Sequence, residues 1–172
     1  MNRCWPICCA ALLLCTMPSV VTAQPRTPRQ DECAQPNRPV LLDTGCRVLD
    51  DFLEAFNARD VARWATTLNY PHVRFSAGEV LIWNSAAKFI EENDIGRLAR
   101  SGWGHSTWDW RMLVQSSGNK LHYLVQFTRY DEADKPIASY ESLYIITLRD
   151  GHWGVQARSS YAGISVSKPA DK

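Results

Sequence analysis

The chain lacks the sequence patterns that carry most cofactor-dependent chemistry. It has no phosphate-binding glycine loop, no Gly-x-Gly-x-x-Gly dinucleotide fingerprint and no Gly-x-Ser-x-Gly nucleophile elbow. Its four histidines occur singly, without His-x-His, His-Glu-x-x-His or paired-cysteine spacing, so no metal site is predicted. These absences exclude the cofactor-dependent enzyme classes, and no cofactor is predicted.

Basic clusters and long apolar runs are also missing. The chain has 19 Lys and Arg against 18 Asp and Glu, and the first 23 residues hold one Arg and no acid. Residues 24–172 therefore have no net charge, which argues against a nucleic acid partner. One apolar stretch, near the N-terminus, is too short for the roughly 20 residues that a membrane span requires.

That stretch is typical of a secretory signal peptide over residues 1–23. Arg3 supplies the positive start, Ile7 to Leu14 the apolar core, and Val21-Thr22-Ala23 the small-residue cleavage site. A lipoprotein would use Cys15, but Leu14 before it is bulkier than lipoprotein processing normally tolerates. We expect an exported protein, periplasmic or extracellular.

Cysteine usage agrees with export. Four of the six cysteines lie within residues 1–23, and Cys33 and Cys46 remain. In an oxidising compartment two cysteines most simply form a disulfide, here between the N-terminal arm and the first helix. A redox-active pair is the alternative, but the usual Cys-x-x-Cys spacing is absent.

The remaining 149 residues suffice for one domain with a core. Residues 24–39 are rich in Pro, Gln, Arg and Asp and are predicted to be a flexible arm. The globular domain is expected over residues 40–162, followed by a polar tail over 163–172.

Helices are predicted first along the domain. Apolar residues recur at helical spacing from Val48 to Phe56. Asp60 is a suitable N-cap for a second helix that includes Leu68 and that Pro71 ends. After a short hairpin (72–76 and 79–83), Asn84 or Ser85 is expected to cap a third helix that continues to about Leu98.

Four longer strands follow, at 106–115, 119–130, 137–148 and 152–160. Asp150-Gly151 between the last two is the strongest hairpin signal in the chain. Helices followed by a run of strands indicate an α+β fold. We expect helices packed on a curved antiparallel sheet that forms an open cone.

Four segments carry a resemblance to a known family: Phe52–Asp60, Asn69–Arg74, Phe127–Asp131 and Gly151–Ser160. With the element order, they resemble the nuclear transport factor 2-like superfamily, specifically its SnoaL-like branch. The resemblance implies a pocket between the helices and the concave sheet, and often a homodimer. It implies no single activity, because this fold hosts isomerases, cyclases, dehydratases, epoxide hydrolases and domains without catalysis.

The residues that ketosteroid isomerases of this superfamily use are not found. Their general-base Asp lies on the strand that reads His72-Val-Arg-Phe-Ser76 here, which holds no acid. Their oxyanion-hole Asp lies on a late strand, where this chain has Ser142, Leu143 and Tyr144. Isomerase chemistry is therefore disfavoured.

His72 is the best single acid–base candidate, because the ordinary histidine pKa lies in the useful range. The alternative is a histidine hydrogen-bonded inside the seam between helices and sheet. Glu141 is a second catalytic candidate if it points into the cavity, and it could instead pair with Arg129 on the neighbouring strand. Arg74 could anchor an anionic group, or pair with a surface carboxylate.

Aromatic residues mark two strand faces. Trp108, Trp110 and Met112 alternate on one strand, and Tyr140, Ser142 and Tyr144 alternate on another. On a concave face they would form an aromatic pocket for a small apolar or aromatic molecule. The alternatives are ordinary core packing and a buried dimer face. Trp64 and Trp83 are assigned to the core.

The last strand places Gln156, Arg158 and Ser160 on one face. A polar row in a strand that otherwise reads as buried either lines a wet pocket or faces solvent on the convex side. Two functions remain open: a binding or accessory module with a pocket for a small organic ligand, or a cofactor-independent lyase, isomerase or hydrolase that uses His72.

Overall fold

The computed structural model describes residues 29–76 and 78–163. The expected signal peptide, residues 24–28 of the expected arm, and the expected tail beyond Gly163 lie outside the described residues. Within these ranges, no helix is both long enough and apolar enough to cross a bilayer.

Six strands form one open sheet in the order β2-β1-β6-β5-β4-β3. The strands are β1 (Leu68–Ser76), β2 (Glu79–Trp83), β3 (His105–Ser117), β4 (Lys120–Tyr130), β5 (Pro136–Arg149) and β6 (His152–Ser160). The strands β3 to β6 form the expected antiparallel meander. The sheet as a whole is mixed, because β1 pairs with β6 in parallel.

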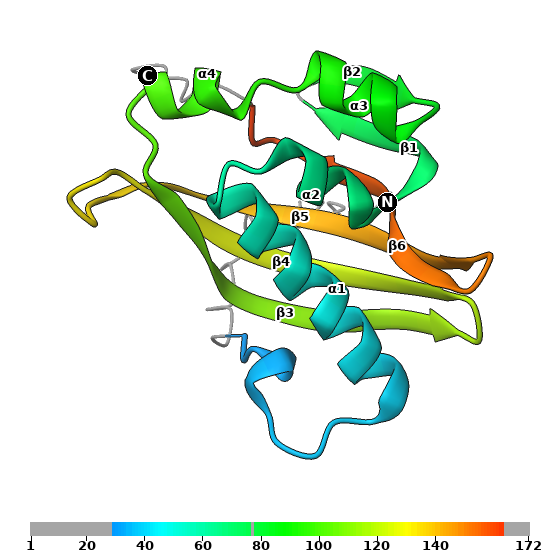
Figure 1. The fold of residues 1–172 in the computed structure, drawn as a ribbon. Coiled ribbons are helices and arrows are strands. Elements are labelled where there is room, and N and C mark those ends of the chain that lie inside the picture. Colours follow the sequence, from blue (N-terminus) through cyan, green and yellow to red (C-terminus); the bar gives the residue numbers. More distant parts are fainter. Residues whose placement is uncertain (1–28, 77, 164–172) are drawn as a thin grey trace, which may run out of the picture.

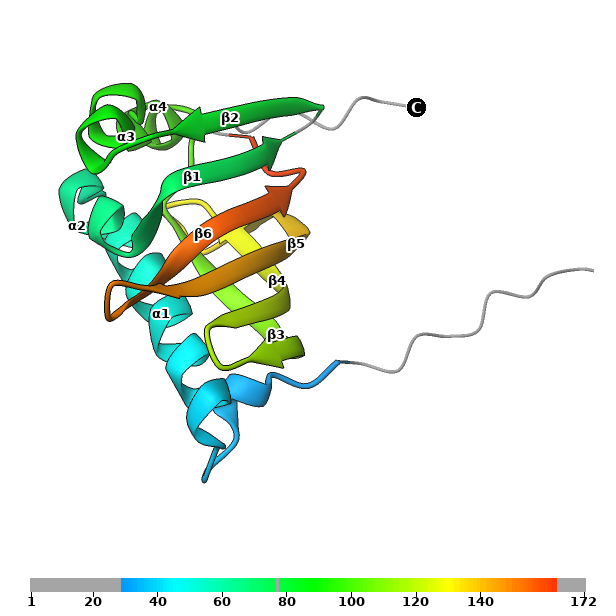
Figure 2. The same ribbon diagram turned by 90° about the vertical axis from the view of Figure 1, so that its right-hand side faces the viewer.

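The helices lie on one side of this curved sheet (Figures 1 and 2). They are α1 (Val40–Asn57), α2 (Val61–Thr66), α3 (Ala86–Glu92) and α4 (Ile95–Arg100), with a short 3-10 helix, η1 (Glu32–Ala34), before them. α1 crosses the sheet, and its apolar stripe packs on the meander. The predicted α+β arrangement of helices on a curved, unclosed sheet is confirmed.

Two predicted helix boundaries were wrong. The second helix ends at Thr66, because the Thr67 carbonyl accepts from the Val155 amide and Leu68 already begins β1. Pro71 lies inside that strand, after a cis peptide bond. The predicted third helix is two helices, since Asn93 and Asp94 are extended between them.

The Asp150-Gly151 turn forms as predicted. Both residues have positive φ, 49° and 79°, as a two-residue hairpin turn of the I′ type requires. The turn sets the register in which β5 and β6 pair, from Arg149 opposite His152 onward.

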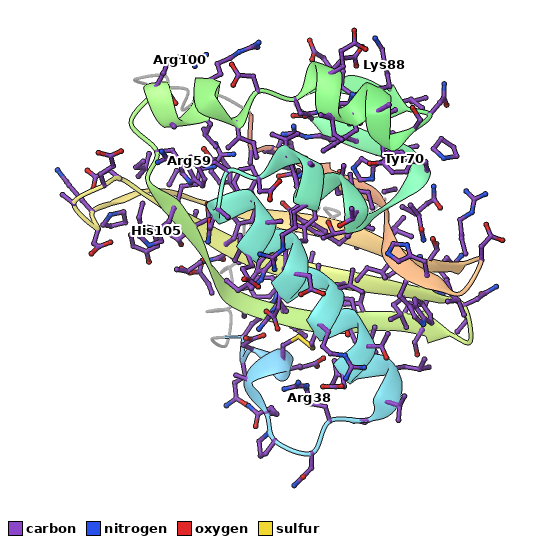
Figure 3. The ribbon with its side chains drawn as sticks, in the orientation of Figure 1. Arg38, Arg59, Tyr70, Lys88, Arg100 and His105 are labelled. Atoms are coloured by element: carbon purple, nitrogen blue, oxygen red, sulfur yellow. A yellow bond between two sulfur atoms is a disulfide. The ribbon has the colours of Figure 1, made fainter. Side chains whose placement is uncertain are left out.

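The described part of the expected arm lies against the edge of the sheet. The carboxylates of Asp31 and Glu32 accept from the backbone amides of Arg111 and Leu113 on β3, at 3.0 and 2.8 Å. These bonds use donors that an edge strand would otherwise leave open. The expected disulfide between Cys33 and Cys46 is present, with 5.5 Å between the Cα atoms, and ties η1 to α1 (Figure 3).

Close packing of α1 on β4 occurs beside this disulfide. Gly45 lies against the Tyr123 ring, and a Cβ atom built on Gly45 would lie 2.3 to 2.6 Å from ring atoms. The Tyr123 side chain is fully buried, and its hydroxyl donates to the Leu42 carbonyl at 2.7 Å. The ring therefore has little freedom to move, and only a residue without a side chain fits at position 45.

Gly45→Ala is expected to lower the free energy of unfolding by up to about 2 kcal/mol. The helix propensity of alanine favours the change by about 1 kcal/mol, but overpacking against a fixed ring costs about 1–3 kcal/mol. Urea unfolding measures the difference. Gly118→Ala is the control, since a Cβ there meets open space. A stabilising effect of Gly45→Ala would contradict the account.

Candidate functional site

A cavity lies between the C-terminal half of α1, the segment around α4 and the concave face of the sheet. The cavity is small, with a volume of about 40 Å³ open to the centre of a water molecule. The interior is therefore narrow and suits a small, flat molecule better than a bulky one.

Aromatic rings form most of the wall. Phe52 lies 5.4 Å from Trp64 and 5.5 Å from Tyr144, and the Trp108 ring lies 5.9 Å from Tyr144 and 6.1 Å from Phe127. All of these pairs meet edge to face, an arrangement that the charge distribution of aromatic rings favours. The rings come from α1, α2 and three strands, so the wall forms only when the helices pack on the sheet.

Three arginines reach the same cavity from different strands: Arg74 on β1, Arg129 on β4 and Arg158 on β6. Arg74 and Arg158 are direct partners in the parallel pairing of β1 with β6, so their side chains leave the sheet on the same face. All three residues are buried, with exposed fractions of 3%, 4% and 8%.

The guanidinium groups use few of their donors. Arg74 donates through Nη2 to the Ala162 carbonyl, and Arg129 donates through Nη2 to the Gly163 carbonyl at 2.7 Å. Arg158 lies 5.3 Å from the ring centres of Phe52 and of Trp64. Among the described residues, Arg74 Nε, Arg158 Nε, and both Nε and Nη1 of Arg129 are buried without a hydrogen-bond partner.

Arg111, on β3, shows how this protein neutralises another buried arginine. Its guanidinium contacts Asp31 Oδ2 at 2.9 Å and also pairs with Asp50. Burial alone would lower the pKa of Arg111, but the two carboxylates raise it above its usual value. Within the described residues, the three cavity arginines form no ion pair.

The positive charge inside the cavity affects these arginines themselves. Burial, and then the neighbouring charge of Arg158, lowers the pKa of Arg74 to about 9. Burial likewise lowers the pKa of Arg129. With a pKa of about 9, Arg74 remains protonated at neutral pH, so the fold holds a cation in an apolar setting that disfavours it.

Asp94 is the one acidic side chain among the described residues that line the cavity. It is half exposed and accepts from Nη2 of Arg100, at the end of α4 (Figure 3), at 2.8 Å. That hydrogen bond lowers the pKa of Asp94. Asp94 is thus already engaged by Arg100, and no three metal-ligating side chains converge within residues 29–76 and 78–163.

Half of the predicted site residues lie at this cavity. They are Arg74, Trp108, Arg129, Tyr144, Arg158 and Ser160. Phe52, Phe56 and Leu98 also line it, and the sequence analysis did not name them as site residues. Trp64 is buried as expected and also contributes to the cavity wall.

Two bulges move predicted site residues to other positions. The pairing of β3 with β4 shifts between Trp108 and Trp110, so Asp109 is an extra residue. Because strand faces alternate with period two, Trp110 and Met112 leave the cavity side, and Arg29 packs 4.5 Å from the Trp110 ring. The expectation that Trp108, Trp110 and Met112 share one face was wrong.

The second bulge lies in β6, opposite Ile145 and Ile146. Gln156 is the extra residue there, and its side chain donates to the Pro71 carbonyl instead of lining the cavity with Arg158. Ser142 is buried beside the cavity, where its hydroxyl donates to Ser160 Oγ at 2.7 Å. Tyr140 packs 5.5 Å from the Phe127 ring, beyond the lining residues.

His72 is fully buried and does not line the cavity. Its Nδ1 lies 2.9 Å from the Val155 carbonyl, which can only accept, so Nδ1 carries the hydrogen. Burial, and then the charge of Arg158, lowers the pKa of His72 to about 3. Glu141 lies on the opposite face of β5 from Tyr144, where Arg29 contacts it at 3.4 Å. Neither residue is placed for chemistry in the cavity.

Comparison with known proteins identifies the fold. No family model matches the chain, and no curated protein matches its sequence. A solved NTF2-like protein from Cytophaga hutchinsonii is 18% identical, with a TM-score of 0.56 over 70% of this chain and 96% of its own. The fold is that of NTF2-like proteins.

Other similar structures agree with this NTF2-like fold. A protein of unknown function with a cystatin-like fold from Nostoc punctiforme is 11% identical, with a TM-score of 0.59 over 72% of this chain and 92% of its own. A ketosteroid isomerase-like protein from Erwinia carotovora atroseptica is 17% identical, with a TM-score of 0.52 over 67% and 90%. At these identities the likeness shows the fold alone.

Protonation of His72 is expected to destabilise the folded protein in acid. The folded-state pKa of about 3 lies below the unfolded value near 6.5, so the folded state binds fewer protons between these pH values. The stability present above pH 6.5 is therefore lost as the pH falls toward 3, with a slope of up to about 1.4 kcal/mol per pH unit from this residue. Urea unfolding of wild type and His72→Gln between pH 7 and pH 4 measures it. If the free energy of unfolding fell with pH equally steeply in both proteins, His72 would not be the residue responsible.

Arg74→Met is expected to raise the free energy of unfolding by about 1 kcal/mol. The change removes a buried charge that lies beside Arg158, and apolar replacement of buried charges is often stabilising. Arg97→Met is the control, because Arg97 is exposed on α4. Unfolding in urea without added organic acids tests this. If Arg74→Met instead lowered the free energy of unfolding by more than about 2 kcal/mol, the charge of Arg74 would have to be compensated by other groups in the folded protein, and the account would be wrong.

Proposed function

We propose that this protein is an exported binding or accessory module that holds a small organic molecule in the cavity beneath α1. The observation that carries the proposal is the aromatic wall of Phe52, Trp64, Trp108 and Tyr144 around a narrow free space. Ligand pockets are mostly apolar with a few convergent polar groups, and this cavity has that composition.

Binding is favoured over catalysis because the cavity offers no suitable acid or base among its described lining residues. A general base that works near neutral pH needs a pKa in that range and must reach the substrate. Asp94 is held by Arg100, and His72 has its Nδ1 engaged by a backbone carbonyl outside the lining. The alternative hydrolase, lyase or isomerase has no supporting group here.

Export rests on the N-terminal sequence and is supported by the disulfide, which persists in oxidising compartments. The expected homodimer stays a prediction. A binding module needs only the single cavity, so this proposal does not depend on a second copy.

Trp108→Ala is expected to weaken the binding of an uncharged aromatic probe, indole, by about tenfold. The ring forms one side of the wall, and loss of an aromatic contact is worth about 1.4 kcal/mol, or one factor of ten. Saturation-transfer NMR on the purified protein measures the affinity.

Trp153→Ala is the matched control, because Trp153 packs against the core but does not line the cavity. It should leave the affinity for indole unchanged. Equal losses in the two variants, or no binding of indole to wild type, would contradict the proposal. Native mass spectrometry of the protein purified from its own compartment would show which small molecule it carries.

A further inference from the structure

We infer that the ligand is an organic acid whose oxyanion group binds to Arg74, Arg129 and Arg158, with its apolar body against the aromatic wall. The inference rests on the proposed function and adds the chemical class of the ligand. It concerns a small molecule with a carboxylate or a similar oxyanion, carried on a flat apolar body.

The first argument is the number of unused donors inside the cavity. Each of the three arginines is more than nine-tenths buried, lines the cavity and keeps at least one buried N–H without a partner among the described residues. Buried polar groups are almost always hydrogen-bonded, so a cluster of exceptions needs an explanation. A ligand that brings acceptors supplies one.

The second argument is charge. Like charges directly opposite each other on paired strands are destabilising, yet Arg74 and Arg158 are such a pair. Elsewhere in the same protein, the buried side chain of Arg111 forms ion pairs with two carboxylates, those of Asp31 and Asp50. The cavity arginines have two backbone carbonyls and the faces of aromatic rings instead. An anion in the cavity would supply the missing negative charge.

The third argument is the shape of the donors. Guanidinium groups are planar and bind carboxylates and phosphates through two parallel N–H···O bonds, which a point charge cannot reproduce. Packing over Phe52 and Trp64 limits the movement of Arg158, and Arg129 lies 5.3 Å from the Tyr140 ring centre. The donors are thus held in place before a ligand arrives, which reduces the ordering cost of binding.

The cavity's own acidic residue does not provide this charge. Asp94 bonds to Arg100, and no ion pair joins it to a cavity arginine within the described part of the chain. Asn93, also in the lining, donates through its amide to the Phe89 carbonyl, which leaves its buried Oδ1 as a further acceptor for a ligand hydroxyl or amide.

The test compares two probes of nearly equal size, indole-3-carboxylate and indole-3-carboxamide, by isothermal titration calorimetry with the full exported chain. The carboxylate should bind at least tenfold more tightly than the amide. Raising the salt concentration should weaken the binding of the carboxylate and leave the binding of the amide unchanged. Equal affinities would overturn the inference while leaving the proposed binding function intact. Failure of both probes and of indole would overturn both proposals.

Variants then locate the oxyanion. Arg158→Gln should reduce the affinity for the carboxylate more than the affinity for the amide, so that the ratio of the two affinities falls. Arg129→Gln should act in the same direction and replaces Arg158→Gln if that variant does not fold. Arg97→Gln removes an exposed arginine from α4 and should change neither affinity. A loss of carboxylate binding in Arg97→Gln equal to that in Arg158→Gln would mean that surface charge alone attracts the anion.

Discussion

The contact between Gly45 and Tyr123 sets how α1 lies on the sheet. A glycine lets the helix backbone reach the ring of β4, next to the disulfide that joins Cys33 to Cys46. The helix crosses the curved sheet (Figure 1), and its last turns carry Phe52 and Phe56, which belong to the packed aromatic cluster and also line the cavity. The cavity wall therefore depends on how α1 packs on the sheet.

Three arginines line the cavity from three different strands. Within the described residues these buried guanidinium groups have no carboxylate partner, which is a cost to folding, because burial disfavours charge and Arg74 lies beside Arg158. Arg111, outside the cavity lining, is paired with Asp31 and Asp50. Arg111 is thus compensated by carboxylates, whereas the cavity arginines are not compensated within the described residues. Residues that bind ligands are commonly not optimised for stability, and the cavity arginines fit this pattern.

Much of the fold can be predicted from the sequence because its signals are local. The Asp150-Gly151 turn, the apolar stripe of α1 and the order of elements all act over a few residues. The bulges at Asp109 and Gln156 carry no such signal, and each one inverts the faces beyond it, which displaced Trp110 and Gln156 from the predicted pocket. The arginine cluster depends on the parallel pairing of β1 with β6, residues far apart in the chain. Each arginine could be proposed from the sequence as a single binding residue. That the three side chains lie in one cavity could be seen only from the folded structure.

The most direct test of the central claim is nitrogen-15 NMR of the arginine Nε–H groups in the ligand-free protein and after addition of indole-3-carboxylate. The account predicts Nε–H signals for Arg74, Arg129 and Arg158 that exchange slowly with water, because these Nε atoms are buried. These signals should shift on addition of the carboxylate and remain in place with the carboxamide. Signals that respond to neither compound, or equally to both, would contradict the claim that the cavity is built to receive an anion.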